Sequence, residues 1–267
     1  MIRAAVTGAG GRMGAQIIRA VASTAGIALA GAVERPDHPV VGRDAGDVSG
    51  VGPLGISITS ALEPLLPGVD VVIDFTSAAA SLAHLAMVCR SDKAIVIGST
   101  GFGGQERQQI RQTAAQARVF LAPNMSVGVN VLFKVVADVA RLLGDGYDVE
   151  IVETHHRLKK DAPSGTALGL AEAVAGALDR DLAKDTCYGR QGLVGERTKR
   201  EIGIHAVRAG DVVGDHTVIF GGLGERVEIT HKASSRETFA RGAVRAALWL
   251  PSQPHGLYDM MDLLGLR

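Results

Sequence analysis

The sequence predicts an α/β protein in which an N-terminal domain with a doubly wound parallel sheet is followed by a second, α+β domain. Three observations predict this fold class. Apolar runs typical of buried strands alternate with helical patterns through the first half of the chain. A glycine-rich turn directly follows the first of these runs. Beyond residue 127 the alternation stops, and the later strand-like runs indicate a roughly four-stranded mixed or antiparallel sheet.

The composition of the 267-residue chain limits what it can bind. Lysine plus arginine and aspartate plus glutamate both number 28, so the net charge is zero. This balance argues against binding nucleic acid or a membrane surface through the electrostatic field of the whole protein. No stretch approaches the ~20 apolar residues that span a bilayer, and the N-terminal apolar run is too short for a signal peptide. Cys89 and Cys187 are too far apart for a CxxC motif. We therefore expect a cytoplasmic protein that binds its anionic partners locally.

Residues 2–7 are expected to form the first strand, and the glycine turn at 8–14 follows at once. Apolar residues at helical spacing follow over 13–21, so the unit is strand, turn and helix. Such a turn lets the backbone approach a pyrophosphate, whose charge then faces the N–H groups at the helix start. The spacing is a GxxGxxG variant, because Met13 stands where the last glycine of GxGxxG would be. The glycines of the variant are Gly8, Gly11 and Gly14.

A second apolar run over 27–33 ends at Glu34 and Arg35, about 20 residues beyond the turn. An acid at this place accepts hydrogen bonds from the adenine ribose hydroxyls, whereas an adjacent arginine pairs with a 2′-phosphate. Because both residues are present, we expect NADH and NADPH each to be usable. The competing interpretation is an ordinary pair of charges at a strand end.

Two further buried strands are expected at 69–75 and 93–97, with helices at 78–89 and 105–117, followed by a strand at 119–121. This alternation is typical of a Rossmann-type domain, in which ligands bind beyond the carboxyl ends of the strands. Residues that follow those strand ends are therefore placed to line the nicotinamide end of a cofactor. They are Gly98, Thr100, Ala122, Pro123, Asn124 and Met125.

The second half is expected to begin at a crossing point over 124–127. The predicted helices are 129–143, 166–178 and 236–250, and the predicted strands are 147–154, 202–207, 216–220 and 227–231. Residues 182–199 are polar and glycine-dotted, which is consistent with an exposed loop or with an arm to another subunit.

We expect residues 1–126, completed by a C-terminal helix over 236–267, to form a dinucleotide-binding domain. Residues 127–235 would form the substrate-binding and oligomerisation domain. The helices would cover one face of its sheet, and pairing of the other face between subunits would make a homotetramer.

The stretch ETHHRLKKDAPSGT at 153–166 gathers proton donors beside a helix start. A histidine or lysine can donate a proton next to a hydride-accepting atom, and the backbone N–H groups of Gly165 and Thr166 suit a carboxylate. Together they point to reduction of a small anionic substrate. Taken alone, so many cations are more often a solvated basic loop. A metal site is disfavoured because adjacent histidines on a strand point to opposite faces and no third ligand is suitably spaced.

At these residues the chain resembles the 4-hydroxy-tetrahydrodipicolinate reductase family, also called the dihydrodipicolinate reductases. The HHxxKxDAPSGT motif is the most specific part of the resemblance. The matching segments are GAGGRMG at 8–14, ER at 34–35, IDFT at 73–76, GSTGF at 98–102, APNMSVGVN at 122–130, ETHHRLKKDAPSGTA at 153–167 and ITHKASSRETFA at 229–240. They run from end to end of the chain.

The resemblance implies NADPH- or NADH-dependent reduction of 4-hydroxy-tetrahydrodipicolinate, a cyclic dicarboxylate, in diaminopimelate and lysine biosynthesis, without a metal. It assigns proton donation to His155 and Lys159, and binding of substrate carboxylate to His156, Gly165 and Thr166. Arg157 and Lys160 keep the interpretation of solvated cations. The implied cofactor-binding residues are Gly8, Ala9, Gly10, Gly11, Arg12, Met13, Glu34, Arg35, Gly98, Ser99, Thr100, Ala122, Pro123, Asn124 and Met125.

Two other classes of function stay open at this point. Another small-substrate NAD(P) dehydrogenase, such as an aspartate or semialdehyde dehydrogenase, would share the first domain, although acylating versions need a nucleophilic cysteine that neither Cys89 nor Cys187 is placed to supply. A non-catalytic module that senses NAD(P)H would not need paired proton donors beside an anion-binding turn.

Overall fold

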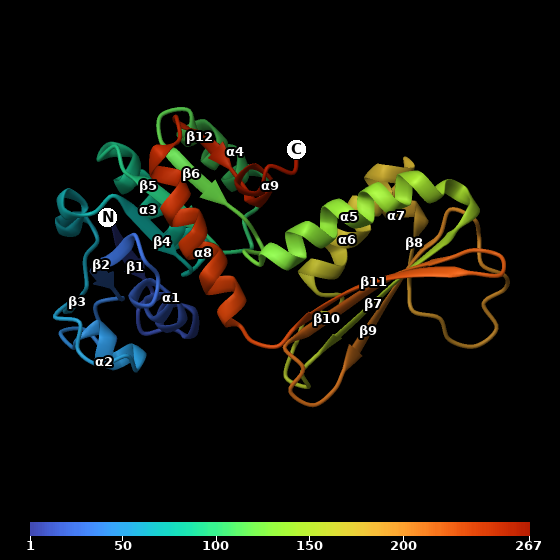
Figure 1. The fold of residues 1–267 in the computed structure, drawn as a ribbon, viewed down its shortest axis with the longest axis horizontal. Coiled ribbons are helices and arrows are strands. Elements are labelled where there is room, and N and C mark those ends of the chain that lie inside the picture. The colour runs from blue at the N-terminus through green and yellow to red at the C-terminus, as the bar shows by residue number, and fades with distance from the viewer. The chain divides into compact units, whose positions relative to one another are not determined.

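The computed structural model describes all of residues 1–267. The chain forms two compact units (Figure 1). The first unit comprises Met1–Val127 together with Glu237–Arg267, and the second comprises Gly128–Arg236. Each unit has its own buried core.

The first unit is built on a sheet of seven parallel strands in the order β12-β6-β5-β4-β1-β2-β3. The order reverses between β1 and β4, and ligands bind at such switch points beyond the carboxyl ends of the strands. The strands are β1 (Ile2–Thr7), β2 (Ile27–Val33), β3 (Ile58–Thr59), β4 (Val71–Asp74), β5 (Ala94–Ile97), β6 (Arg118–Leu121) and β12 (Gly256–Tyr258).

Helices cover both faces of this sheet, because successive side chains of each strand point to opposite faces. On β4, Val71 and Ile73 pack in the core that includes α1 and α8, whereas Val72 packs in the core that includes α3 and α4. The helices of this unit are α1 (Arg12–Ala22), α2 (Ala45–Ser49), α3 (Ala78–Arg90), α4 (Gly104–Ala114), α8 (Glu237–Trp249) and α9 (Met260–Leu264), with 3₁₀ segments at Glu63–Gly68 and Leu250–Ser252. The chain thus forms the predicted doubly wound, Rossmann-type domain.

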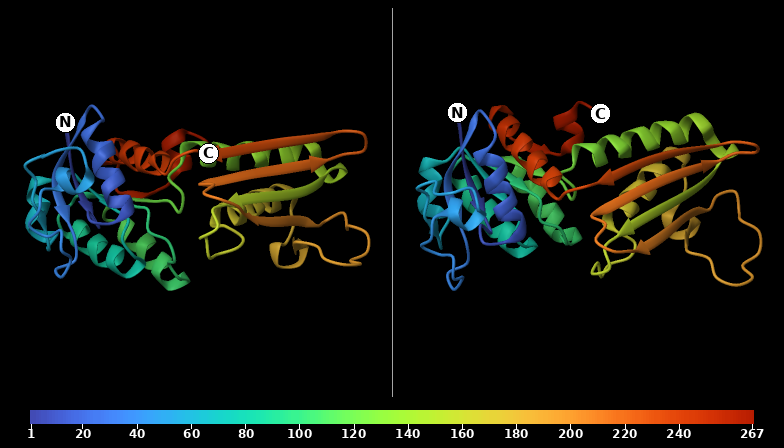
Figure 2. Two further views of the ribbon diagram at one scale, coloured as in Figure 1. Left: turned by 90° about the horizontal axis from the view of Figure 1, so that it is seen from below. Right: turned by 60° about the horizontal axis from the view of Figure 1, so that its bottom comes forward.

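The second unit contains a five-stranded mixed sheet in the order β11-β10-β7-β9-β8. Neighbours from β11 to β7 are antiparallel, and those from β7 to β8 are parallel. Helices α5 and α6 lie on the same face of this sheet (Figure 2) and share a core with it. The elements are α5 (Val127–Leu143), β7 (Asp148–His155), α6 (Gly165–Leu178), α7 (Leu182–Asp185), β8 (Thr186–Tyr188), β9 (Ile202–Arg208), β10 (Gly214–Gly221) and β11 (Arg226–Ala233), with a 3₁₀ segment at Gly144–Gly146.

Three short edge strands and one helix boundary differ from expectation. The second sheet has five strands rather than about four, because β8 forms, with α7, inside the segment 182–199 that was expected to be a loop or arm. Strands β3 and β12, also at sheet edges, were not predicted, since two or three residues are too few to show a period of two. The C-terminal segment 236–267 is not one helix: α8 ends at Trp249, before Pro251, whose ring cannot continue a helix interior.

None of the helices is both long and apolar enough to cross a membrane.

Candidate active site

The glycine turn joins β1 to α1 and requires glycine at two of its positions. Gly8 has φ +68°, in the left-handed region. A Cβ added at Gly14 would lie only 2.0 Å from the carbonyl oxygen of Gly8, so the start of α1 packs directly on the turn. The N-cap residue, Gly11, offers no side-chain hydrogen bond, and the first turn of α1 holds no acidic residue. The N–H groups at the start of α1 are therefore suited to a phosphate.

Glu34 connects the end of β2 to this turn. The backbone N–H of Gly10 donates to Glu34 Oε2 at 3.0 Å, and that of Arg35 donates to Oε1 at 3.0 Å. The carboxylate is thus held beside the glycine turn, with each of its oxygens accepting a backbone hydrogen bond. The Arg35 side chain is exposed beside it.

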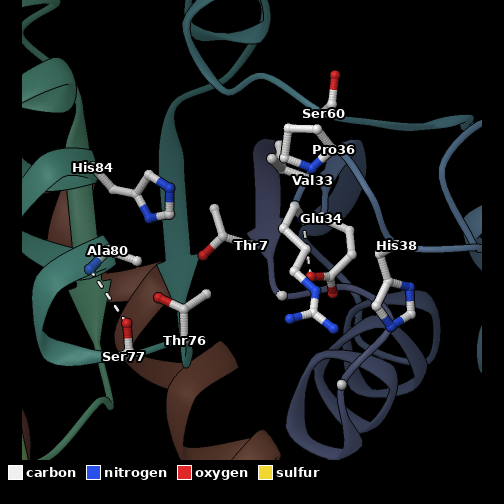
Figure 3. A pocket seen from close by; sticks show the side chains of 13 residues that line it. Thr7, Val33, Glu34, Pro36, His38, Ser60, Thr76, Ser77, Ala80 and His84 are labelled. Carbon is white, nitrogen blue, oxygen red and sulfur yellow. Dashed lines mark hydrogen bonds between the residues drawn. The ribbon is translucent and has the colours of Figure 1, made fainter.

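A pocket of about 560 Å³ lies at the carboxyl ends of β1, β2 and β4. It is lined by the glycine turn at Gly8 and Gly11 and by both Glu34 and Arg35, so the structure brings these predicted residues together. Figure 3 shows Glu34 on one side of the pocket and His84, from α3, on the other. The volume and the mixed polar lining suit a small organic ligand such as a nucleotide.

The segments expected at the nicotinamide end follow β5 and β6 and do not line that pocket. A Cβ at Gly98 would meet the ring of Phe75 at 2.2 Å, so this turn also needs glycine. The side chain of Ser99 is buried, and its hydroxyl oxygen lies 2.8 Å from that of Ser81. Met125 is 1% exposed and packs in the core of the first unit, and its carbonyl lies against α8, where a Cβ at Gly242 would meet it at 1.8 Å. The segment Ala122–Met125 is therefore held by core packing.

Sequence reasoning missed a polar cluster beneath this edge of the sheet. The fully buried Asp74 receives hydrogen bonds from His84 Nδ1 at 2.6 Å, from the Thr76 hydroxyl at 2.6 Å and from Ser81 at 3.1 Å. Burial acts to raise the pKa of Asp74, but the contacts with His84 and Thr76 outweigh it and hold that pKa below its ordinary value. Through Ser81 and Ser99 the cluster joins β4, α3 and the turn after β5. The available signal was an aspartate at the end of an otherwise apolar strand.

In the second unit, β7 delivers the histidine pair and α6 begins the carboxylate-binding turn. His155 is the last residue of β7 and only 8% exposed, and its Nδ1 lies 2.5 Å from Glu153 Oε2. His156 follows the strand and is half-buried, with Nε2 3.3 Å from a guanidinium nitrogen of Arg236. The two histidines therefore have different environments, as expected for adjacent positions at a strand end.

Helix α6 begins at Gly165 with Ser164 as its N-cap, whose hydroxyl accepts from the N–H of Ala167 at 3.1 Å. Gly165 is exposed, and a Cβ there would meet nothing within 4 Å, so this helix start is open. The first turn holds no acidic residue. Together these features suit an incoming carboxylate at Gly165 and Thr166.

Lys159 lies between these elements and pairs with Asp161, whose two oxygens are 2.7 and 2.9 Å from Nζ. That contact lowers the pKa of Asp161. Arg157 and Lys160 are exposed. No group of three or more histidine, cysteine or acidic side chains is arranged to hold a metal ion.

A doubly wound sheet with a glycine turn and an acid after its second strand defines a dinucleotide-binding oxidoreductase class. Two family models refine this class: one described as "Dihydrodipicolinate reductase, N-terminus" matches residues 2–125, and one described as "Dihydrodipicolinate reductase, C-terminus" matches residues 128–264. The chain belongs to the dihydrodipicolinate reductase family, which confirms the resemblance seen in its motifs.

Known relatives agree over the full length. The chain is 57% identical to the 4-hydroxy-tetrahydrodipicolinate reductase of Syntrophus aciditrophicus (strain SB) and 55% identical to that of Syntrophobacter fumaroxidans (strain DSM 10017 / MPOB), in each case over all of both chains. A dipicolinate-bound dihydrodipicolinate reductase from Paenisporosarcina sp. TG-14 superimposes with a TM-score of 0.75 at 26% identity, covering 98% of each chain. An amine dehydrogenase from Mycobacterium smegmatis, at 13% identity and TM-score 0.62 over 97% of this chain and 95% of its own, shares the fold.

Proposed function

We propose that the protein catalyses the NAD(P)H-dependent reduction of 4-hydroxy-tetrahydrodipicolinate to tetrahydrodipicolinate in diaminopimelate and lysine biosynthesis. In this reaction the substrate loses its hydroxyl as water and gains a hydride and a proton. The full-length identity to reductases of this name and the dipicolinate bound to a structural relative support the proposal. The second unit supports it too. Its Glu153 contacts the buried His155 through one carboxylate oxygen, and the other oxygen accepts from the backbone N–H of Ser164, the N-cap of α6.

The residues of the first unit fit the dinucleotide. The uncapped start of α1 would hold the pyrophosphate at Gly8–Met13, Glu34 would accept from the ribose, and Arg35 would pair with a 2′-phosphate. The residues proposed for the nicotinamide end are Gly98, Ser99, Thr100, Ala122, Pro123, Asn124 and Met125. When bound, the dihydronicotinamide supplies the hydride.

The residues of the second unit would hold the substrate and provide the proton. One carboxylate would lie at the start of α6, bound by the N–H groups of Gly165 and Thr166, with His156 beside it. His155 would donate the proton, because it is nearly buried and the ring nitrogen remote from Glu153 can face a ligand. Lys159, paired with Asp161 in this structure, would turn to the substrate as the second donor.

We also propose a cytoplasmic homotetramer. Side chains such as Val152 on β7 and Ile219 on β10 lie on the face of the second sheet opposite α5 and α6, since their neighbours in sequence pack under those helices. A second copy of the same sheet would cover this face. The two cysteines are unpaired, which suits a reducing compartment. Analytical ultracentrifugation at assay concentrations tests the assembly, and a monomer would contradict it.

A coupled assay tests the activity. Purified protein would be supplied with 4-hydroxy-tetrahydrodipicolinate generated in place, and the absorbance of NADPH, then of NADH, would be followed. Oxidation that requires the dicarboxylate is the expected result. Oxidation only with another substrate, such as an imine formed from ammonia and oxaloacetate, would favour an amino-acid dehydrogenase, and tight binding without oxidation would favour a sensing module.

A further inference from the structure

We propose that Glu153 is a positioning residue that fixes which nitrogen of His155 faces the substrate. Arg208, on the neighbouring strand β9, binds both oxygens of the Glu153 carboxylate. This inference rests on the proposed reductase activity and deepens it. Glu153 precedes His155 by two positions on β7, so both side chains lie on the same face of the sheet.

Four hydrogen bonds define the orientation of the carboxylate. Arg208 contacts both oxygens, at 2.9 Å to Oε2 and 3.0 Å to Oε1. The backbone N–H of Ser164 donates to Oε1 at 3.1 Å, and His155 Nδ1 lies 2.5 Å from Oε2. Glu153 is completely buried. A bidentate arginine on a buried carboxylate is a rigid arrangement, so the carboxylate can orient the imidazole rather than follow it.

The protonation of Glu153 decides which nitrogen of the imidazole carries a hydrogen. Burial acts to raise the pKa of Glu153, but its contacts with Arg208 and His155 outweigh burial and lower that pKa. An ionised carboxylate only accepts hydrogen bonds, so His155 Nδ1 must donate. His155 Nε2 is then the nitrogen left for proton transfer.

The surroundings of Nε2 support this assignment. A Cβ built at Gly214 on β10 would lie 3.0 Å from His155 Nε2, so a side chain there would crowd the atom that glycine leaves accessible. The ring of His216 packs edge-on against His155, with centroids 5.1 Å apart and an interplanar angle of 75°. His216 Nε2 lies 3.0 Å from the hydroxyl of Ser164, the N-cap of α6. Glu153 and His216, the two side chains in contact with the His155 ring, are thus both hydrogen-bonded to Ser164.

The charged and titratable groups around His155 and its neighbour His216 come from four strands and one loop. Glu153 lies on its own strand, Arg208 on β9, His216 and His231 on β10 and β11, and Lys159 on the following loop. Burial lowers the pKa of His216 to about 4 and lowers that of His231, so neither adds charge near neutral pH. Glu153 is therefore the anion that directly stabilises a protonated His155, while Arg208 and Lys159 oppose it.

Glutamine at position 153 keeps the size of the side chain and removes its charge. For Glu153→Gln we expect kcat to fall about 10²-fold, which is within the rate contribution of a correctly positioned general acid. The KM for NADPH should stay within about twofold. We also expect the alkaline limb of the pH profile to move to lower pH, because the imidazolium loses its counter-charge. Glu150→Gln is the matched control: Glu150 is another arginine-paired acid of β7, three residues away, and its loss should leave that limb in place.

Tautomer measurement tests the idea even if the variant does not fold. In wild-type protein labelled with ¹⁵N-histidine, neutral His155 should carry its hydrogen on Nδ1, with that proton shifted far downfield by Glu153. A hydrogen on Nε2, or a folded Glu153→Gln enzyme with an unchanged alkaline limb, would overturn the inference. Wild-type protein that does not oxidise NADPH would instead refute the proposed activity, and the tautomer would still report on the positioning.

Discussion

Removing Arg35 tests how the protein distinguishes NADPH from NADH. The side chain is exposed at the rim of the cofactor pocket. Its backbone N–H donates to Glu34 Oε1, a bond that Arg35→Ala leaves intact, so the substitution should not displace the end of β2. The perturbation is therefore the loss of one exposed positive charge beside the expected position of the 2′-phosphate.

The exposure of Arg35 sets the size of the effect. Exposed ion pairs contribute up to about 1 kcal/mol, which corresponds to roughly a fivefold change in affinity. We thus expect the Kd for NADPH to rise about fivefold and that for NADH, which has no 2′-phosphate, by less than about twofold. The difference should shrink toward 1 M salt, where the screening length falls to ~3 Å.

Fluorescence titration of both cofactors at low and high salt measures these constants. Arg107→Ala removes the same charge from an exposed position on α4 outside the pocket and should change neither Kd. Equal weakening of both cofactors by Arg35→Ala, or a salt-independent loss, would refute contact between Arg35 and the 2′-phosphate.

Three further substitutions address the catalytic loop, the glycine turn and the acid stability of the second unit. Lys159→Ala should lower kcat by about 10² to 10⁴ with cofactor Kd unchanged, and normal turnover in steady-state assays would remove Lys159 from the mechanism. Gly14→Ala should cost about 1–3 kcal/mol of unfolding free energy through the clash with Gly8 and weaken cofactor binding; Gly104→Ala, whose methyl meets nothing within 4 Å, is the control in thermal melts and titrations. His216 has its pKa lowered from 6.5 to about 4, so the unfolded chain takes up the proton first. The stability that neutral His216 contributes is present above pH 6.5 and lost as the pH falls to about 4, and amounts to about 3 kcal/mol. Denaturant unfolding of His216→Gln should show a smaller loss over this range, and an equal loss would contradict the assignment.

The first unit was predictable because its signals are local. Buried parallel strands are continuous apolar runs, and glycines at a strand–helix junction have few other uses. Gly8, Gly11, Glu34 and Arg35, chosen from spacing alone, do line one pocket. Edge strands such as β8 escaped because their pairing is set by neighbours distant in sequence, and three residues carry no period.

The supporting residues of the site were harder to predict for the same reason. Glu153 stands in the motif itself, two positions before His155, and its place on the same strand face could have been inferred. Its partner Arg208, however, lies 55 residues further along the chain and meets it only through the pairing of β7 with β9. Likewise Asp74 looked like a simple strand end until α3 placed His84 against it.

A protein without net charge can bind two anionic ligands if the first turns of the relevant helices contain no acidic residue. The short helices α2, α7 and α9 and the longer α4 and α8 all carry an acidic residue in the first turn. Helices α1, α3, α5 and α6 carry none. Of these four, α1 and α3 border the cofactor pocket, α5 follows the segment proposed for the nicotinamide end, and α6 begins at the proposed carboxylate site. An acid in the first turn would compete with a bound anion for the same N–H groups. The helix starts proposed to lie at the ligands thus differ from the others by a feature that is readable in the sequence once the helix boundaries are known.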